Sequence, residues 1–262
     1  MILHVTEAGA GPPVVLLHGL LGMARNLGAV QRALAQRFRV LALDMRNHGA
    51  SPHGADMRYA TLAHDVLETM DAHATGPAAV VGHSMGGKAA MAAALLRPEA
   101  IARLVVADIA PVAYSPRNAP VAAALRAIPF VPGLTRAEAD SSLAGAVPEA
   151  SVRAFLLQNL VFGPSPAWRI GLEEIAAALP VLEHWENPSG ASYGGPTLFV
   201  AGARSDFIRP EHRPVIRALF PASRFVTVKN AGHWLHVDNP AGFLSVIEAF
   251  LHDWSGAANP GG

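Results

Sequence analysis

The 262-residue sequence predicts an α/β fold: a mostly parallel sheet with helices on both faces and an inserted helical cap. Three observations support this fold class. Short apolar runs alternate with amphipathic stretches, the alternation stops between Pro111 and Pro196, and the composition (51% hydrophobic, 15% charged) is typical of a globular chain. We therefore expect residues 1–110 and 196–262 to form the core domain and residues 111–195 to form the cap.

The alternation of apolar and amphipathic segments places the individual elements. Strands are expected at residues 2–6, 14–18, 39–43, 78–81, 104–109, 197–201 and 225–228, where the runs are apolar or β-branched. Helices are expected at residues 26–36, 61–74, 87–96, 211–219 and 240–254. Near-continuous apolar strands indicate a parallel sheet that is covered on both faces. In such sheets ligands bind beyond the carboxyl ends of the strands, so the chemistry is expected there.

The cap segment between Pro111 and Pro196 has a different composition from the rest of the chain. It holds 11 of the 21 prolines and three or four short helical patterns, with no convincing strand. Its aromatic side chains are candidates for lining a substrate pocket, although for any single one of them packing within the cap is the favoured interpretation. These candidates are Phe130, Phe155, Phe162, Trp168 and Trp185.

Composition excludes several classes of function. The chain has no cysteine, so disulfides, thiolate-bound metals and a thiol nucleophile are excluded. A net charge of zero gives no reason to expect a nucleic-acid partner. The first residues, MILHVTEAGAGPP, do not resemble a signal peptide, and no apolar run approaches the roughly 18 residues that span a bilayer. We expect a cytoplasmic protein that acts on a small molecule, with an undetermined oligomeric state.

The stretch GHSMGGK, which follows a strand and opens a helix, matches two unrelated motifs. Gly82 to Gly86 reads G-x-S-x-G, the turn that exposes a nucleophilic serine. Gly82 to Lys88 also reads as most of a phosphate-binding P-loop, but that motif needs a hydroxyl after the lysine to hold magnesium. Ala89 occupies that position. The serine interpretation is therefore favoured over a nucleotide-binding one.

A serine nucleophile needs a base and an oxyanion hole, and the sequence offers both. The base is His233, which follows the last strand in NAGHW, as expected when the triad histidine comes late in the chain. The oxyanion hole requires two backbone N–H groups. Met85 supplies the first, directly after Ser84, and the early loop LLHGLLG supplies the second through Leu20 or, as an alternative, Leu21.

Other polar residues near these motifs have simpler interpretations. His18 and His83 are expected to steady their turns, and no third ligand accompanies His233 and His236, so no metal is expected. Lys88 lies in the first turn of a helix, where a positive charge opposes the helix dipole. It can pair with a carboxylate such as Asp44 or contact an anionic group, and the sequence does not decide between these.

The motifs LLHGLLG, DMRNHGAS, GHSMGGK and NAGHW resemble the α/β-hydrolase superfamily across essentially the whole chain. The combination of DMRNHG, GHSMGGKA, VVADIAPVAY and GHWLHVDNP is similar to the YbfF-like esterases. The resemblance implies the α/β-hydrolase fold and a serine carboxylesterase that cleaves short- to medium-chain acyl esters or acyl thioesters. It implies an acyl-enzyme intermediate and no cofactor.

The acid of the triad has two candidates. Asp206 lies in LFVAGARSDF, after the strand that follows the cap, and Asp108 lies at the tip of the earlier strand LVVAD. Either carboxylate would have to orient His233 and stabilise its imidazolium form. YbfF-like esterases carry a serine at the position of Ser205 and use the earlier aspartate. The resemblance therefore implies Asp108 as the acid, with Ser205 hydrogen-bonded to the histidine–aspartate pair.

Two functions other than ester hydrolysis remain open at this level. The first is another reaction on the same fold, because relatives with a cap include C–C bond hydrolases, a lyase and cofactor-free haloperoxidases. The second is a small-molecule receptor that keeps the triad but turns over very slowly.

Overall fold

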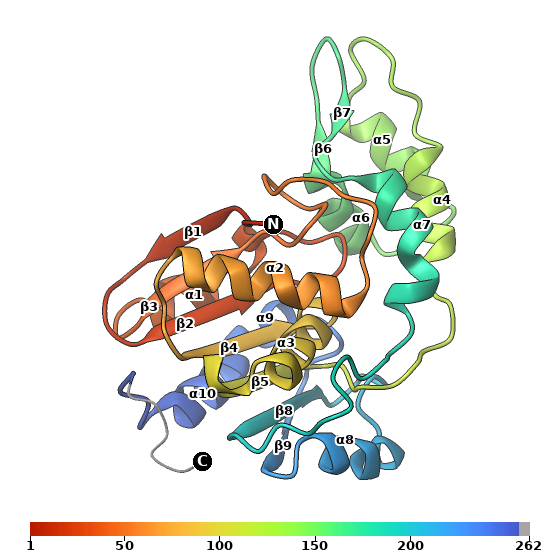
Figure 1. Cartoon of the computed structure of the whole chain (residues 1–262). Coiled ribbons are helices and arrows are strands. Elements are labelled where there is room, and N and C mark those ends of the chain that lie inside the picture. The colour runs from red at the N-terminus through yellow and green to blue at the C-terminus, as the bar shows by residue number, and fades with distance from the viewer. Residues whose placement is uncertain (257–262) are drawn as a thin grey trace.

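The computed structural model describes residues 1–256, and its core is a seven-stranded sheet in the order β1-β3-β2-β4-β5-β8-β9 (Figure 1). All neighbouring strands are parallel except the edge strand β1, which pairs antiparallel with β3. The strands are β1 Val5–Ala8, β2 Pro13–Leu17, β3 Arg39–Leu43, β4 Ala78–His83, β5 Ile101–Ala107, β8 Thr197–Gly202 and β9 Ser223–Val228. Five of them begin within two residues of the expected positions.

Two strands begin three residues from the expected position: β1 begins later and β5 begins earlier. Ahead of β1, Leu3 is buried, and its N–H donates to Thr69 Oγ1 at 2.9 Å. The apolar run at the N-terminus therefore packs partly against a helix, and only residues from Val5 onward pair with the sheet.

Helices cover both faces of the sheet, and the strand sequence explains why. In β2, Val14 and Leu16 pack into one core cluster while Val15 and Leu17 pack into the other, because successive side chains point to opposite faces. One face is covered by α1 Gly28–Leu34 and α10 Pro240–Leu251. The opposite face is covered by α2 Tyr59–Ala72, α3 Met85–Leu96 and α8 Arg213–Leu219. Short helical turns η1 Ala24–Leu27, η2 Pro98–Ala100, η4 Pro210–His212 and α9 Leu235–Asp238 connect these layers.

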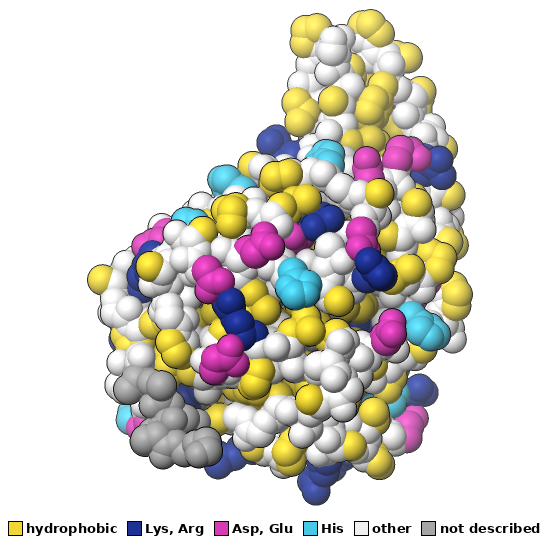
Figure 2. Space-filling view, in the orientation of Figure 1, with side chains coloured by type: hydrophobic (Ala, Val, Ile, Leu, Met, Phe, Trp, Pro, Cys, Tyr) yellow, Lys and Arg dark blue, Asp and Glu magenta, His cyan; other side chains and the backbone are white. Residues whose placement is uncertain are grey.

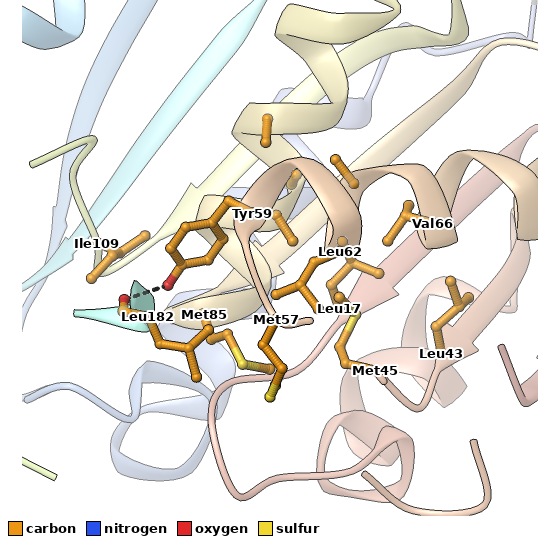
Figure 3. Close-up of a cluster of buried hydrophobic side chains, with 14 of the residues drawn as sticks. Leu17, Leu43, Met45, Met57, Tyr59, Leu62, Val66, Met85, Ile109 and Leu182 are labelled. Atoms are coloured by element: carbon orange, nitrogen blue, oxygen red, sulfur yellow. Dashed lines mark hydrogen bonds between the residues drawn. The ribbon is translucent and has the colours of Figure 1, made fainter. Parts of the chain in front are cut away.

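The core on the α2 side reaches the cap directly. Figure 3 shows Met45, Met57 and Leu62 packed below Tyr59, whose ring lies at the end of this cluster. The Tyr59 hydroxyl donates a 2.7 Å hydrogen bond to the Leu182 carbonyl of the cap. Burial raises the pKa of Tyr59, so it stays a neutral donor. A buried contact therefore holds the end of a cap helix on the core.

Between β5 and β8 the chain leaves the sheet and forms the cap, which projects to one side of the core (Figure 1). Its helices are α4 Ala119–Arg126, α5 Arg136–Leu143, α6 Ala150–Leu156, the turn η3 Leu157–Asn159 and α7 Leu172–Leu182. The expectation that this segment has no strand was wrong. A hairpin of β6 Leu160–Val161 and β7 Ala167–Trp168 lies before α7, and strands of two residues are too short to show an alternating pattern.

Within residues 1–256, no helix is long and apolar enough to cross a membrane.

Candidate active site

Ser84 lies at the sharp turn between β4 and α3, at the carboxyl edge of the sheet. Its backbone angles, φ 53° and ψ −118°, fall outside the regions that side-chain-bearing residues normally adopt. The turn is held on both sides, because the Ser84 N–H donates to the Ala107 carbonyl and the Lys88 N–H donates to the Ser84 carbonyl, each at 3.0 Å. Such strain persists only where surrounding structure imposes it, and it is typical of functional sites.

The glycines of GHSMGG permit this turn. A Cβ atom on Gly82 would collide with the backbone of Gly86, and one on Gly86 would lie 2.5 Å from the carbonyl oxygens of Leu17 and His18. The strand and helix therefore approach each other, and the neighbouring loop, more closely than any side chain would allow.

His233 and Asp108 extend a hydrogen-bonded chain from Ser84. His233 Nε2 lies 3.1 Å from Ser84 Oγ, and His233 Nδ1 lies 2.8 Å from Asp108 Oδ2. Asp108 is fully buried, and its other oxygen accepts from the Gly202 N–H at 3.0 Å. Because Nδ1 faces a carboxylate, it carries the proton, which leaves Nε2 free to accept the proton of the serine hydroxyl.

The two candidate acids occupy different environments. Asp206 is 61% exposed, and its carboxylate pairs with the Arg117 guanidinium at 2.9 Å, which lowers the pKa of Asp206. It is therefore directed away from His233. Ser205, one residue earlier, donates a hydrogen bond to Asp108 Oδ2. The structure thus brings Asp108 and Ser205 to the histidine and leaves Asp206 outside.

Two contacts set the position of His233 itself. The ring of Phe207 stacks on the imidazole, with centroids 4.0 Å apart and an interplanar angle of 23°. His83 Nε2 donates to the His233 carbonyl at 2.8 Å. Burial lowers the pKa of His83 well below its ordinary value, with the neighbouring imidazoles as further causes, so His83 is neutral. Its expected role of steadying a turn agrees with this geometry.

The loop after β2 passes beside Ser84, as an oxyanion hole requires. A Cβ atom on Gly19 would lie 3.2 Å from the Ser84 Cβ. The Leu21 N–H is already used, because it donates to His48 Nε2 at 3.0 Å. The geometry therefore favours Leu20 over Leu21 as the donor that accompanies Met85. All three residues line the same cavity as Ser84.

Two buried histidines hold this loop in place. His18 Nε2 accepts from the Met45 N–H at 2.9 Å, and His48 Nδ1 donates to the Arg46 carbonyl at 2.7 Å. Burial lowers the pKa of both rings, that of His48 to about 3, so both act as neutral hydrogen-bonding groups. The motif DMRNHG thus supports the loop that carries Leu20.

Lys88 does not pair with Asp44, the partner suggested by the sequence. Asp44 instead accepts from the Ala24 N–H at 2.7 Å. Lys88 is almost completely buried, and its Nζ donates to the His184 carbonyl at the end of α7 at 2.6 Å. Burial lowers the pKa of Lys88 to about 7, although the carboxylate of Glu183 opposes this shift.

Ser84 and His233 open into a cavity of about 860 Å³ between the core and the cap. Most of its wall is apolar. Leu20 and Ile109 line it from the core, and Val121, Val152 and Phe155 line it from the cap. The volume suits a molecule of small to moderate size.

Of the five cap aromatics predicted to line the pocket, only Phe155 does so. Trp185 packs against Tyr59 with centroids 6.0 Å apart, and Trp168 packs against Phe130 with centroids 5.6 Å apart. Phe162 is partly buried against the core cluster and does not reach the cavity. For these four residues the structure shows the alternative, packing within the protein, because aromatic content does not reveal the direction of a side chain.

Sequence reasoning missed other lining residues. Trp234 lines the cavity and packs against Phe155, with ring centroids 5.0 Å apart, and Tyr114 and Phe207 also line it. A signal for two of them existed, because Trp234 directly follows His233 and Phe207 lies two residues after Ser205. His236 lines the cavity as well, and burial lowers its pKa to about 4. Among the described residues, no three side chains are arranged to hold a metal ion.

The fold and this arrangement match a known class of protein. A model of the α/β hydrolase fold matches residues 12–240, so the chain belongs to the α/β-hydrolase family and the expected fold class is confirmed. Within that family, the chain is similar to the YbfF-like esterases, as the sequence motifs suggested.

The relatives support this grouping. Esterase YbfF of Escherichia coli is 36% identical over 242 residues, which cover 92% of this chain and 93% of that protein. The sn-1-specific diacylglycerol lipase ABHD11 of Mus musculus is 41% identical over 249 residues, covering 92% of this chain and 81% of that protein. A solved structure described as a marine microorganism esterase superposes with a TM-score of 0.92 at 33% identity, covering 95% of this chain and 99% of the other.

Proposed function

We propose that this protein is a serine ester hydrolase that works through an acyl-enzyme intermediate. The observation that carries the proposal is the hydrogen-bonded chain from Ser84 through His233 to buried Asp108, at the floor of an apolar cavity. A serine hydroxyl becomes an effective nucleophile when a positioned base accepts its proton. The names of the relatives, an esterase and a diacylglycerol lipase, agree with ester substrates.

In the first half of the reaction, Ser84 Oγ attacks the ester carbonyl carbon while His233 Nε2 takes the hydroxyl proton. The N–H groups of Leu20 and Met85 stabilise the oxyanion that forms, and each such donor contributes about 3 kcal/mol. Asp108 stabilises the imidazolium form of His233. The oxyanion then collapses, and His233 gives its proton to the departing alcohol or thiol.

In the second half, a water molecule attacks the acyl-enzyme, with His233 Nε2 again acting as the base. The same N–H groups stabilise the second oxyanion, and collapse of this intermediate returns the proton to Ser84 and frees the acid. Ser205 acts on Asp108 rather than on substrate. Its hydrogen bond to the carboxylate keeps the oxygen aimed at His233.

The cavity suggests acyl chains of short to medium length. Its apolar walls favour burial of an alkyl chain, at about 0.8 kcal/mol for each methylene. We therefore expect kcat/KM to rise from acetyl to butyryl and hexanoyl esters. Acyl thioesters are cleaved by the same steps, because the thiol replaces the alcohol as the leaving group.

A chain-length series of p-nitrophenyl esters and acyl-CoA thioesters tests the proposal. Ser84→Ala removes the nucleophile, and we expect kcat to fall by a factor on the order of 10⁶. Ser151→Ala is the matched control, because Ser151 lines the same cavity from the cap. It should keep kcat within about twofold.

Turnover by Ser84→Ala close to that of the wild type would overturn the serine mechanism. Negligible turnover of every ester by the wild type, together with tight binding of an ester analogue, would support the slow-turnover receptor. Cleavage of a C–C bond without cleavage of any ester would place the protein with the other capped members of the fold.

A further inference from the structure

Two loops at the far end of the cap form an uncharged apolar projection. They comprise residues 129–133, between α4 and α5, and residues 161–168, around the β6–β7 hairpin, and we call them together the cap tip. Phe130 and Trp168 hold the loops together, with ring centroids 5.6 Å apart. Figure 1 shows both loops extending beyond the cap helices, away from the sheet.

The cap tip exposes apolar side chains that no other part of the described chain covers. Val131 is 50% exposed, Phe130 40% and Val161 39%. No charged residue occurs between Arg126 and Arg136, or between Arg153 and Arg169. Figure 2 shows the same pattern in space, because the visible surface of the projection is hydrophobic or uncharged and charged side chains appear only at its base.

The charged residues that flank each loop in the sequence are arginines. Among the described residues, two of them form ion pairs and two do not. Arg126 pairs with Glu173 at 2.7 Å, and Arg153 pairs with Asp140 at 3.0 Å, so these two are neutralised. Arg136 donates to the Leu157 and Ala154 carbonyls and pairs with no carboxylate of residues 1–256. The exposed Arg169 donates its backbone N–H to the Asn159 carbonyl.

The nearby acidic groups lie on the cap helices and not in the two loops. Glu138 is the closest carboxylate in sequence to loop 129–133, and it accepts from the Thr135 N–H and hydroxyl at the start of α5. These hydrogen bonds lower the pKa of Glu138, so it stays ionised two residues after Arg136. Glu173 and Asp140 are held in the two ion pairs. Arg136 and Arg169 follow the two loops in the sequence, and they are the arginines there that are not held in an ion pair with a carboxylate of the described residues.

We propose that the cap tip docks on the surface of a phospholipid bilayer, with its apolar loops in the acyl boundary and Arg136 and Arg169 at the phosphates. Transfer of exposed apolar loops from water into the boundary between headgroups and acyl chains is favourable. Tryptophan is enriched at this same boundary. Guanidinium groups bind phosphate oxygens with good geometry. The tip rests on the surface and does not span the membrane.

A second copy of the chain fits this surface less well. Stable interfaces between proteins bring together about 20–30 residues on each side. The cap tip consists of loops of five and eight residues and is convex, so it offers too small a matching surface.

The cap tip is connected to the cavity wall through the chain. The loop 161–168 continues directly from α6 and η3, and α6 supplies Val152 and Phe155 to the cavity wall. Binding to the bilayer itself does not depend on the proposed hydrolysis.

Sedimentation with vesicles tests the proposal without any hydrolysis. Vesicles of phosphatidylcholine mixed in equal parts with phosphatidylglycerol should bind the wild type. Val131→Ser combined with Val161→Ser should weaken binding by about tenfold or more, because two exposed apolar groups are lost. Ile2→Ser combined with Val226→Ser is the matched control, with exposed fractions of 50% and 37% on the core, and should bind as the wild type does.

Two further measurements sharpen the result. Arg169→Gln should weaken binding to these vesicles by about fivefold, the effect of one basic residue at an anionic surface. Brominated lipids should quench the fluorescence of the wild type, and Trp168→Phe should remove most of that quenching. Hydrolysis of soluble p-nitrophenyl acetate should be unchanged in the tip variant, which separates this proposal from the catalytic one.

Wild-type protein that fails to sediment with any of these vesicles would overturn the proposal. Equal binding by the tip variant and the wild type would also overturn it. Self-association of the wild type that the tip variant loses, with no vesicle binding, would assign the surface to a second copy instead.

Discussion

Asp108 reaches His233 from an unusual backbone conformation. Its φ of 53° lies in the left-handed region, and its N–H donates to the Val200 carbonyl at 2.8 Å. This turn at the end of β5 directs the carboxylate across the sheet edge, where Gly202, Ser205 and His233 donate to it. An aspartate that precedes the cap in the sequence can therefore accept a hydrogen bond from a histidine 125 residues later.

At the scale of single residues, we predict that Asp108→Asn lowers kcat by about 10⁴, because asparagine holds His233 in the wrong tautomer. Asp206→Asn should leave kcat within about threefold, since it breaks only an exposed ion pair with Arg117, worth at most about 1 kcal/mol. Steady-state kinetics on p-nitrophenyl butyrate measures both. The reverse pattern would make Asp206 the acid.

At the scale of elements, the turn from β4 into α3 packs directly against the loop after β2. Gly86 lies against the carbonyls of Leu17 and His18, so the helix that follows Ser84 and the loop that carries Leu20 meet without a side chain between them. Both proposed oxyanion donors depend on this close approach.

We predict that Gly86→Ala lowers kcat by about 10²–10³, because the added methyl group separates the helix from the loop and moves an oxyanion donor. Overpacking should also lower the free energy of unfolding by about 1–3 kcal/mol. Gly145→Ala is the control, because a Cβ atom there meets no atom within 4 Å. Kinetics and urea denaturation measure both effects, and a wild-type kcat in Gly86→Ala would contradict the oxyanion assignment.

At the scale of the whole molecule, Lys88 connects the two layers that enclose the cavity. It arises from the core helix α3 and ends at the carbonyl of His184, just beyond the cap helix α7. Its Nζ also lies 5.3 Å from the Tyr59 ring centroid and 5.1 Å from that of Tyr114. The His184 carbonyl and the two aromatic rings surround a buried amine that forms no ion pair with a carboxylate of residues 1–256.

This environment makes the stability of the protein depend on pH. The folded state holds the pKa of Lys88 at about 7, against 10.5 ordinarily, so between these values the unfolded chain binds the additional proton. Raising the pH through this window therefore stabilises the folded wild type. We predict that its free energy of unfolding rises relative to Lys88→Met by about 1.4 kcal/mol for each pH unit.

Urea denaturation of both proteins at several values between pH 7 and pH 10 measures this difference. Lys88→Met is a suitable reference because methionine keeps a long apolar stem and has no titrating group. Parallel stability curves for the two proteins would show that Lys88 keeps its ordinary pKa in the folded state.

The sequence by itself determined the fold class and pointed to Ser84 and His233. Those inferences depend on local order: an apolar strand, a glycine-rich turn and a helix are encoded within a few residues, and parallel strands bring their carboxyl ends to one edge. The β6–β7 hairpin was not predicted, because its strands are only two residues long and show no alternating pattern.

The family resemblance pointed to Asp108, but only the tertiary structure decided which carboxylate faces His233 and which aromatic rings line the cavity. Asp108 and Asp206 both follow strands that end at the same edge, and only the backbone turn at Asp108 and the ion pair of Asp206 with Arg117 separate them. Phe155 faces the cavity while Phe130 and Trp168 pack together at the far end of the cap. The direction of a side chain in short, irregular helices is set by long-range packing, which neighbouring residues in the sequence do not specify.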